Sequence, residues 1–366
     1  MTRTRSRPLG PPRMLSRTRL ACLRAALACA ALPLAAPDGF APAARAQDRV
    51  GTTVATFLTL GAGARGQALG HAYVASARGG DALFWNPAGA ARRGRENGSV
   101  FLTQHEWIAD IRYNAAGVTL PVGGAGVIGV SLAAVDYGRD DVRTERQPEG
   151  TGETFGASDF SFGLTYARPL TESFSFGATA KVVRQTIWDM SATGFATDFG
   201  VSLDTGFNGV VLAASIQNFG TKMQMGGINA QQFVDVDEGT AGNTENVTAE
   251  LDMDSWDMPL SFRFGAAAPV VRAGSAELRL LADAQQTNDN VLNADFGGEL
   301  AYDAGPVELE VRAGYRDAFV SAVDGHYSFG GGLRASLLGY TVGADVAYLP
   351  FDLLGGSTLF DLRFEF

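Results

Sequence analysis

Histidine, serine and carboxylate side chains are the groups through which this chain could carry out chemistry. Its three histidines, His71, His105 and His326, are far apart in the sequence and have no companion at metal-ligand or triad spacing. No Gly-x-Ser-x-Gly element is present, and we can assemble no Ser/His or Asp/His constellation on the predicted elements. We therefore expect no catalytic residue, no metal site, no cofactor and no enzyme activity.

Gly61, Gly63 and Gly66 satisfy a G-x-G-x-x-G pattern, the turn that holds the phosphates of a dinucleotide when it joins a strand to a helix. A dinucleotide fold also needs strands and helices that alternate along the chain, and none follow here. We set the dinucleotide interpretation aside.

Charged residues are spread along the predicted inner face of the chain's β segments and are of both signs. This pattern predicts a hydrated interior whose charges pair with one another, and the alternative is a polar pathway through it. The residues are Arg279, Asp283, Glu299, Glu308, Glu310, Arg312, Arg334, Asp345, Asp361, Arg363 and Glu365.

The first 46 residues have the order of a secretory signal peptide: arginines, a short apolar run over 25–36, and Ala44-Arg45-Ala46 as a cleavage motif. We expect cleavage before Gln47. An alternative, in which Cys29 carries a lipid, remains open.

Cleavage at that position changes both the thiol content and the charge. Both cysteines, Cys22 and Cys29, leave with the segment, so no disulfide or thiolate site remains. Eight Arg and one Asp leave as well, so that 29 basic and 39 acidic residues become 21 and 38, a net charge of −17. A chain this acidic, with no basic patch, is not expected to bind nucleic acid.

The elements that must position all of these groups are strands. The last residues show the pattern most clearly, because Phe360, Leu362, Phe364 and Phe366 alternate with Asp361, Arg363 and Glu365. Alternation with period two predicts a strand with an apolar face and a polar face.

Similar segments of about the length that a tilted strand needs to cross a bilayer recur along the chain. We predict fourteen strands, at 99–109, 112–122, 126–138, 157–168, 173–187, 195–205, 208–219, 258–268, 275–286, 292–303, 306–316, 324–338, 339–349 and 358–366.

The connections between these strands alternate in length. Every second one is tight, as at Gly123-Gly124 and Ala304-Gly305, whereas the alternate ones include the two longest, 139–156 and 220–257. Outer-membrane barrels have this asymmetry of short periplasmic turns and long external loops. The fold class is therefore predicted as all-β, a 14-stranded antiparallel transmembrane β-barrel over 99–366 in the bacterial outer membrane, with its N-terminus on the tight-turn side.

Residues 47–98 do not have barrel character, and we expect them to form an N-terminal plug, or hatch, in the lumen. A Gly-Ala-Arg element at Gly63, Ala64 and Arg65 precedes Trp85-Asn86-Pro87-Ala88-Gly89. These residues, with the strand number and the terminal phenylalanine, resemble the PorV/PorQ family of outer-membrane proteins associated with type IX secretion. That family is similar in architecture to the FadL transporters, whose N-terminal segment plugs a fourteen-stranded barrel.

The resemblance implies function and partners. It implies a protein that lies in outer-membrane lipid, whose terminal strand (Phe360, Leu362, Phe364, Phe366) is recognised by the barrel-assembly machinery. It also implies binding of type IX secretion components and secreted cargo. The alternative is a FadL-like transporter with a hydrophobic ligand, an apolar pocket beside the hatch and a kinked strand, for which Gly330-Gly331-Gly332 is a candidate.

The loop 220–257 is the predicted partner-binding element. It carries one Lys and eight acidic residues, with methionines and Trp256 among them. Flexible Met223 and Met225, beside the carboxylates of Asp252 and Asp254, suit a surface that adapts to a protein partner. Calcium at Asp252 and Asp254 is conceivable, but no EF-hand pattern follows.

Overall fold

Alternating side chains produce the strands of this protein. In the last strand, Phe360 and Leu362 are exposed on the outside, whereas Leu359 and Asp361 are buried on the inside. The computed structural model describes residues 51–92, 98–234, 247–320, 325–351 and 355–366. They belong to one compact unit, Asp48–Phe366.

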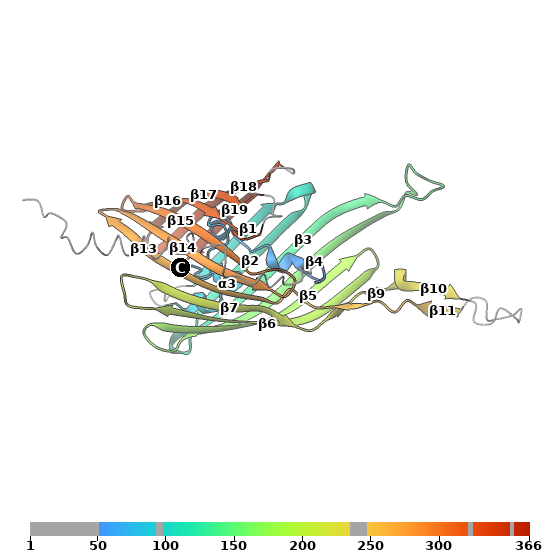
Figure 1. Cartoon of the computed structure of the whole chain (residues 1–366), viewed down its shortest axis with the longest axis horizontal. Helices are drawn as coiled ribbons and strands as arrows, with labels where there is room; N and C mark the ends of the chain where they lie inside the picture. The colour runs from blue at the N-terminus through green and yellow to red at the C-terminus, as the bar shows by residue number, and fades with distance from the viewer. Residues whose placement is uncertain (1–50, 93–97, 235–246, 321–324, 352–354) are drawn as a thin grey trace, which may run out of the picture. The chain divides into compact units, whose positions relative to one another are not determined.

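Fourteen antiparallel strands in the described residues form the barrel wall (Figure 1). They are β1 (Ser99–Glu106), β2 (Arg112–Pro121), β3 (Val127–Asp141), β4 (Thr154–Pro169), β5 (Phe174–Ile187), β6 (Met190–Asp204), β7 (Val211–Gly220), β13 (Ser261–Ala273), β14 (Ala276–Thr287), β15 (Asn293–Asp303), β16 (Val307–Tyr315), β17 (Tyr327–Leu337), β18 (Tyr340–Phe351) and β19 (Gly355–Glu365).

The sheet closes on itself. Each strand pairs with its neighbours in sequence, β7 pairs with β13, and the first strand pairs with the last from Ser99↔Glu365 to Glu106↔Thr358. Closure leaves no strand of the wall with an unpaired edge. A membrane-spanning sheet needs this closure, because lipid cannot form hydrogen bonds with unpaired backbone groups. The predicted fold class is confirmed.

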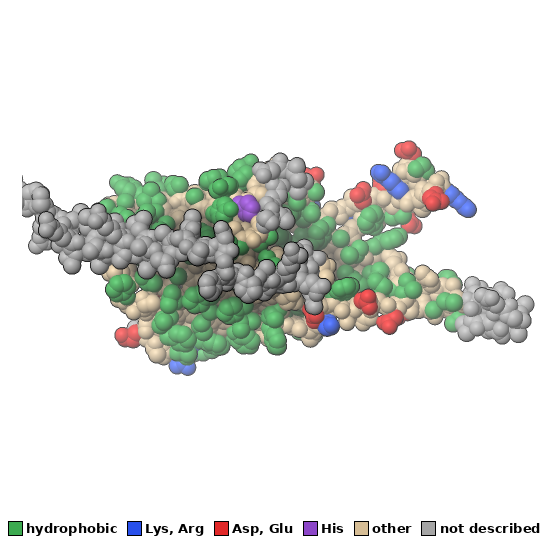
Figure 2. Space-filling model, viewed as in Figure 1, with side chains coloured by type: hydrophobic (Ala, Val, Ile, Leu, Met, Phe, Trp, Pro, Cys, Tyr) green, Lys and Arg blue, Asp and Glu red, His purple; other side chains and the backbone are tan. Residues whose placement is uncertain are grey.

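The exterior of the barrel is apolar. Exposed large hydrophobic residues occur on every barrel strand, for example Leu164, Phe262 and Val346. Figure 2 shows hydrophobic side chains over the visible side of the barrel, with charged side chains gathered toward its two ends. An antiparallel barrel with an apolar exterior is an integral outer-membrane protein. No helix among the described residues is long and apolar enough to cross a membrane.

The connections divide between two ends of the barrel as predicted. The tight-turn end holds, among others, η5 (Gly123–Ala125) and the turns at Gly305 and Gly339. At the long-loop end, β3 and β4 stay paired as far as Asp141↔Thr154, so the predicted loop 139–156 is shorter than expected.

The predicted loop 220–257 contains short elements that the sequence pattern did not predict. They are β8 (Met223–Gln224), β9 (Gly226–Gly227), η6 (Ile228–Ala230), β10 (Gln231–Val234), β11 (Val247–Glu250) and β12 (Ser255–Trp256). β10 pairs with β11, β8 pairs with β12, and β9 pairs with the first two residues of β6. Figure 1 shows β10 and β11 beyond the same end of the barrel as the β3–β4 hairpin.

Residues 51–92 lie inside the barrel and form short helices joined by turns. These are η2 (Thr56–Thr59), α2 (Ala64–Ala68), α3 (Ala82–Trp85) and η3 (Pro87–Ala91), and η4 (Ile108–Asp110) lies between β1 and β2. α2 packs against β16 to β19, and η3 packs against β3 to β6. We call residues 51–92 the plug.

The plug begins at the opposite end from the one predicted. Thr53 Oγ1 donates to Asp289 Oδ2 at 2.7 Å, and the Val54 amide donates to the Asp257 carbonyl at 3.0 Å. Asp289 and Asp257 both lie in long-loop-end connections. The expectation that the N-terminal side of the plug lies at the tight-turn end is therefore wrong for residues 53 and 54.

Glycine in the wall makes room for the plug. A Cβ at Gly200 of β6 would overlap the Asn86 side chain, and one at Gly314 of β16 would overlap the plug backbone at Gly70. The wall and plug are thus complementary at the level of single atoms.

Some predictions fall outside the described residues. These are the signal peptide over 1–46, plug residues 47–50 and 93–97, and loop residues 235–246.

Candidate functional site

The plug motif residues are held by hydrogen bonds within the plug and to the wall. Trp85 Nε1 donates to the Ala62 carbonyl at 2.7 Å. Asn86 Oδ1 accepts from the Ala88 amide at 3.1 Å, which caps η3 with Pro87 in its first turn. Asn86 Nδ2 donates to Val74 in the plug and to Val201 in β6. Asn86 therefore orients the turn and joins it to the wall.

The indole of Trp85 lies at the centre of an aromatic and cationic cluster. Its ring meets those of His71 and Tyr73 edge-on, at centroid distances of 5.5 and 5.6 Å, and the Arg263 guanidinium lies over it at 5.0 Å. Trp85 is 1% exposed. Gly61 and Gly66 give the indole its space, because a Cβ at either would overlap the ring.

Arg65 is the principal ionic link between the plug and the wall. It donates to Glu299 of β15 through Nε at 2.9 Å and Nη2 at 2.7 Å, and it lies 3.6 Å from Glu310 of β16. Arg312 pairs with both carboxylates and, at 2.5 Å, with Asp345. Burial lowers the pKa of Arg65, but Glu299 and Glu310 outweigh it and hold that pKa well above its usual value.

Further carboxylates of the wall accept from the plug backbone. Asp361 accepts from the Ala64 amide, and Asp283 accepts from the amides of Tyr73 and Val74 at 2.8 and 2.9 Å. The mixed charges of the inner face are therefore largely paired, and they fix the plug, as the first of the two sequence interpretations predicts.

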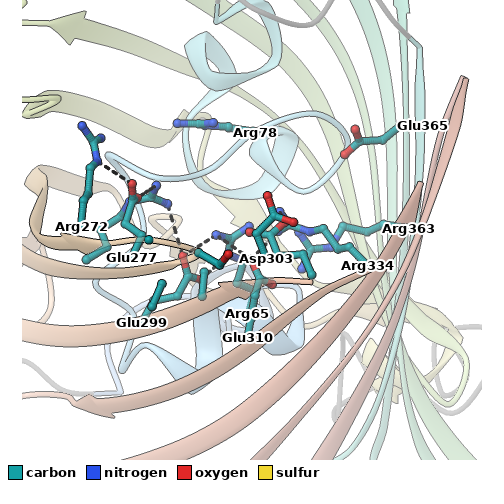
Figure 3. Close-up of a pocket in the computed structure, with 16 residues that line it drawn as sticks. Arg65, Arg78, Arg272, Glu277, Glu299, Asp303, Glu310, Arg334, Arg363 and Glu365 are labelled. Atoms are coloured by element: carbon teal, nitrogen blue, oxygen red, sulfur yellow. Dashed lines mark hydrogen bonds and ion pairs between the residues drawn. The ribbon is translucent and has the colours of Figure 1, made fainter. Parts of the chain in front are cut away.

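A polar cavity of about 460 Å³ lies beside this network (Figure 3). We call it the ionic vestibule. Figure 3 shows Arg65 of the plug pointing toward Glu299 and Glu310, with Arg334 and Arg363 nearby. Six arginines and six acidic residues line it: Arg65, Arg78, Arg272, Arg279, Arg334, Arg363, Glu277, Glu299, Asp303, Glu308, Glu310 and Glu365.

A second cavity, of about 30 Å³, lies between the plug and strands β2 to β7. We call it the plug cavity. Its plug side is largely apolar, and its wall side adds small, polar and two charged residues. The lining residues are Phe57, Leu58, Gly61, Ala62, Leu83, Phe84, Tyr113, Ser131, Ala133, Ser161, Lys181, Asp198, Gln217 and Asn218.

The wall beside the plug cavity is interrupted by a β-bulge. β6 and β7 pair regularly up to Thr197↔Phe219 and from Phe199↔Ile216, so two residues of β7 oppose Asp198 alone. Asn218, the extra residue, has φ of 61° and is buried. By contrast, Gly330-Gly331-Gly332 pairs without a register shift on both sides, so no bulge interrupts the sheet there.

Lys181 and Asp198 form an ion pair that was not predicted from the sequence. These residues lie in separate strands, and only the pairing of β5 with β6 and the bulge bring them together. The available signal was one charged residue on the inner-facing positions of each strand, but such charges are common in the polar interior of a barrel.

The structure also brings together one Ser/His pair that the sequence pattern does not predict. His105 Nε2 lies 2.6 Å from Ser357 Oγ, which donates to the Glu106 carbonyl at 2.6 Å. The serine proton is thus directed at a backbone carbonyl, and within the described residues His105 Nδ1 has no hydrogen-bond partner. This arrangement does not activate Ser357 as a nucleophile.

The predicted partner-binding residues have different environments. Met223 is 1% exposed and packs at Gly194 beside Met258, so it belongs to the base of the loop and cannot contact a partner there. Met225 is partly buried, whereas Trp256 is 47% exposed. Asp252 and Asp254 belong to no group of three metal-binding side chains among the described residues.

The predicted assembly residues lie on the outer face of β19 or at the chain end. Phe360, Leu362, Phe364 and Phe366 are exposed, and Phe364 stacks between Tyr340 and Phe366.

Comparisons with known proteins bear on the fold. No family model and no curated protein matches the sequence. Among solved structures, the CymD monoaromatic hydrocarbon channel matches with a TM-score of 0.57 and 12% identity, over 83% of this chain and 97% of that one.

Two toluene transporters match with a TM-score of 0.50. TbuX of Ralstonia pickettii is 10% identical over 83% of this chain and 97% of its own, and TodX of Pseudomonas putida is 11% identical over 83% and 96%. These matches show a FadL-like barrel fold. They do not show the PorV/PorQ resemblance, which stays a prediction.

Proposed function

We propose that this protein is a non-enzymatic passage for hydrophobic small molecules through the outer membrane. The observation that carries the proposal is the plug cavity, a space between plug and wall that is largely apolar on its plug side and lies beside a break in the sheet. The similar structures are named as a hydrocarbon channel and toluene transporters, which supports the same substrate class.

The plug cavity as it stands is closed to such a solute. Its volume of about 30 Å³ holds one water molecule, whereas a benzene-sized ligand needs a cavity of roughly 150 Å³. Entry therefore requires movement of the plug segment that covers the cavity.

The segment 51–60 is suited to that movement. Hydrogen bonds from Thr53, Val54 and Ala55 hold it at the long-loop end, and the Ala55 amide donates to Gln185 Oε1 at 2.9 Å. Gly61 and Gly63, with φ of 70° and 105°, separate it from the anchored Arg65. Gly61 and Gly63 act in this proposal as a hinge.

The exit for the solute in this proposal is the bulge between β6 and β7. The alternative route along the barrel axis passes the ionic vestibule, where an apolar solute would displace water from charged side chains without replacing its hydrogen bonds. The bulge instead adjoins both the plug cavity and the lipid.

Uptake measurements test the proposed function. Cells that express the protein should take up radiolabelled toluene faster than cells with an empty vector, whereas sucrose uptake should not change. An assembled barrel that raises the uptake of neither toluene nor a longer hydrocarbon would refute the proposal.

Deletion of Asn218 tests the exit. It restores one-to-one pairing opposite Asp198 and keeps the inward and outward alternation of Gln217 and Phe219, so the barrel should assemble. We expect toluene uptake to fall to the empty-vector level. Unchanged uptake would place the exit elsewhere.

A further inference from the structure

The plug cavity holds one cation and one anion, Lys181 and Asp198, among its described lining residues. Lys181 Nζ lies 2.9 Å from Asp198 Oδ1, and the two side chains are 11% and 2% exposed. The pair faces a largely apolar plug surface, including Phe57 and Phe84. It is therefore placed where a solute in the cavity would meet it.

Asn218 completes the pair. Its side-chain oxygen accepts from Lys181 Nζ at 2.5 Å, and its backbone amide donates to Asp198 Oδ1 at 2.8 Å. Its own Nδ2 donates to the Pro259 carbonyl at 3.1 Å, which fixes the side chain. The bulge residue thus holds both charged groups in one geometry.

This geometry leaves the cavity without net charge. Two of the three Lys181 donors are directed at Asp198 and Asn218, and Asp198 supplies the counter-charge. A carboxylate entering the cavity would lose its hydration and meet Asp198 as a like charge. A neutral solute meets neither cost.

We propose that Asp198 is a specificity-determining residue: by neutralising Lys181 it restricts the plug cavity to uncharged hydrophobic solutes and excludes carboxylates. This inference rests on the proposed function. A purely structural role for the pair, as a link between β5 and the bulge, makes a different prediction, because its loss would lower stability without creating a preference for either charge.

Competition with the unaltered protein is the first test. Toluene, benzyl alcohol and benzoate have similar size but differ in charge. Benzyl alcohol should inhibit the uptake of radiolabelled toluene, and benzoate at the same concentration should not. Equal inhibition by benzoate and benzyl alcohol would overturn the inference.

Two single variants should shift the preference in opposite directions. Asp198→Asn leaves the Lys181 cation without its counter-charge, so benzoate uptake should rise relative to toluene by roughly tenfold, the factor that one charge-assisted hydrogen bond provides. Lys181→Gln leaves Asp198 unmatched, so benzylammonium uptake should rise instead.

The double variant Asp198→Asn with Lys181→Gln is the matched control. It removes both charges, so neither charged solute should gain. Assembly of every variant is checked by heat-modifiable migration in detergent gels, and the competition experiment decides the question if a single variant does not assemble. Assembled single variants with the wild-type preference would overturn the inference, whereas absence of toluene uptake in every assembled protein would refute the proposed function instead.

Discussion

Arg65 shows how one residue of the plug depends on several of the wall. It is buried with Glu299 and Glu310, so an alanine at this position leaves carboxylates facing one another with fewer cations. Removal of one partner from a buried ion pair costs roughly 3–5 kcal/mol. We expect the lower end of that range for Arg65→Ala, because Glu299 keeps Arg312.

The measurement is guanidinium unfolding in detergent, followed by tryptophan fluorescence. Arg112→Ala is the control, since Arg112 pairs with Asp136 and the two side chains are 60% and 51% exposed. Its loss should cost about 1 kcal/mol or less. Equal effects of the two variants would contradict the role assigned to Arg65.

His71 predicts how the plug responds to pH. Its removal from water, with the charges of Arg263 and Arg316, lowers its pKa well below the usual value. His71 Nε2 donates to Gln67 Oε1 at 2.9 Å, which requires the Nε2–H form of the ring. His71 therefore binds a proton more readily when the plug has unfolded than when it is folded in the barrel. The stability that neutral His71 contributes is complete above pH of about 6.5 and is lost as the pH falls toward the lowered pKa.

Acrylamide quenching of Trp85 measures this loss, in a protein whose Trp107, Trp188 and Trp256 are replaced by Phe. Quenching should increase between pH 7 and pH 5 as the plug loosens. With the additional substitution His71→Gln, quenching should no longer increase as the pH first falls below 7. If quenching still increases there, another titrating group causes the effect.

The elements of the wall were predictable because each strand separates lipid from the lumen. Alternation gave β16 within a residue at each end, and the terminal phenylalanine strand β19 within three. β6 was predicted to begin at residue 195 but begins at Met190. The two strands of the β5–β6 hairpin stay paired beyond the alternating segment, through mostly polar residues. Hydrogen bonding between neighbours extends such strands, and the hydrophobic pattern does not record it.

The site was less predictable than the wall. Gly61, Arg65 and Trp85 were singled out as motif residues, but their partners on β13, β15 and β16 are set by three-dimensional register. The plug cavity depends further on the bulge at Asn218, which carries no signal in the alternation. Met223 illustrates the reverse error, because its loop position concealed its burial.

The hairpin of β10 and β11 is the element that tests the secretion hypothesis. Phe233 is 76% exposed and Ile228 69%, and the barrel strands do not depend on either. Excision of 228–250 should leave heat-modifiable migration unchanged, because loop length has little effect on stability. The secretion hypothesis would be favoured if the excision abolished co-purification of a secreted partner while toluene uptake persisted. Under that hypothesis, Trp256→Ala should also weaken binding of the partner.

At the scale of the whole molecule, the wall and the plug form a single packed body. Two adjacent glycines of the wall test this packing, because one faces the plug and the other faces away from it. Gly297 of β15 faces inward, where a Cβ would overlap Leu69 at the end of α2, whereas Gly298 has only the Leu280 side chain, 3.7 Å from its Cβ position, as a contact. Gly297→Val should therefore displace the end of α2 at a cost of roughly 1–3 kcal/mol. Gly298→Val should leave the plug in place. Displacement opens a water-filled path past the ionic vestibule, so cells with Gly297→Val should become sensitive to a large hydrophilic antibiotic, and cells with Gly298→Val should not. Equal sensitivity of the two strains would mean that the plug is not held by its fit to the wall.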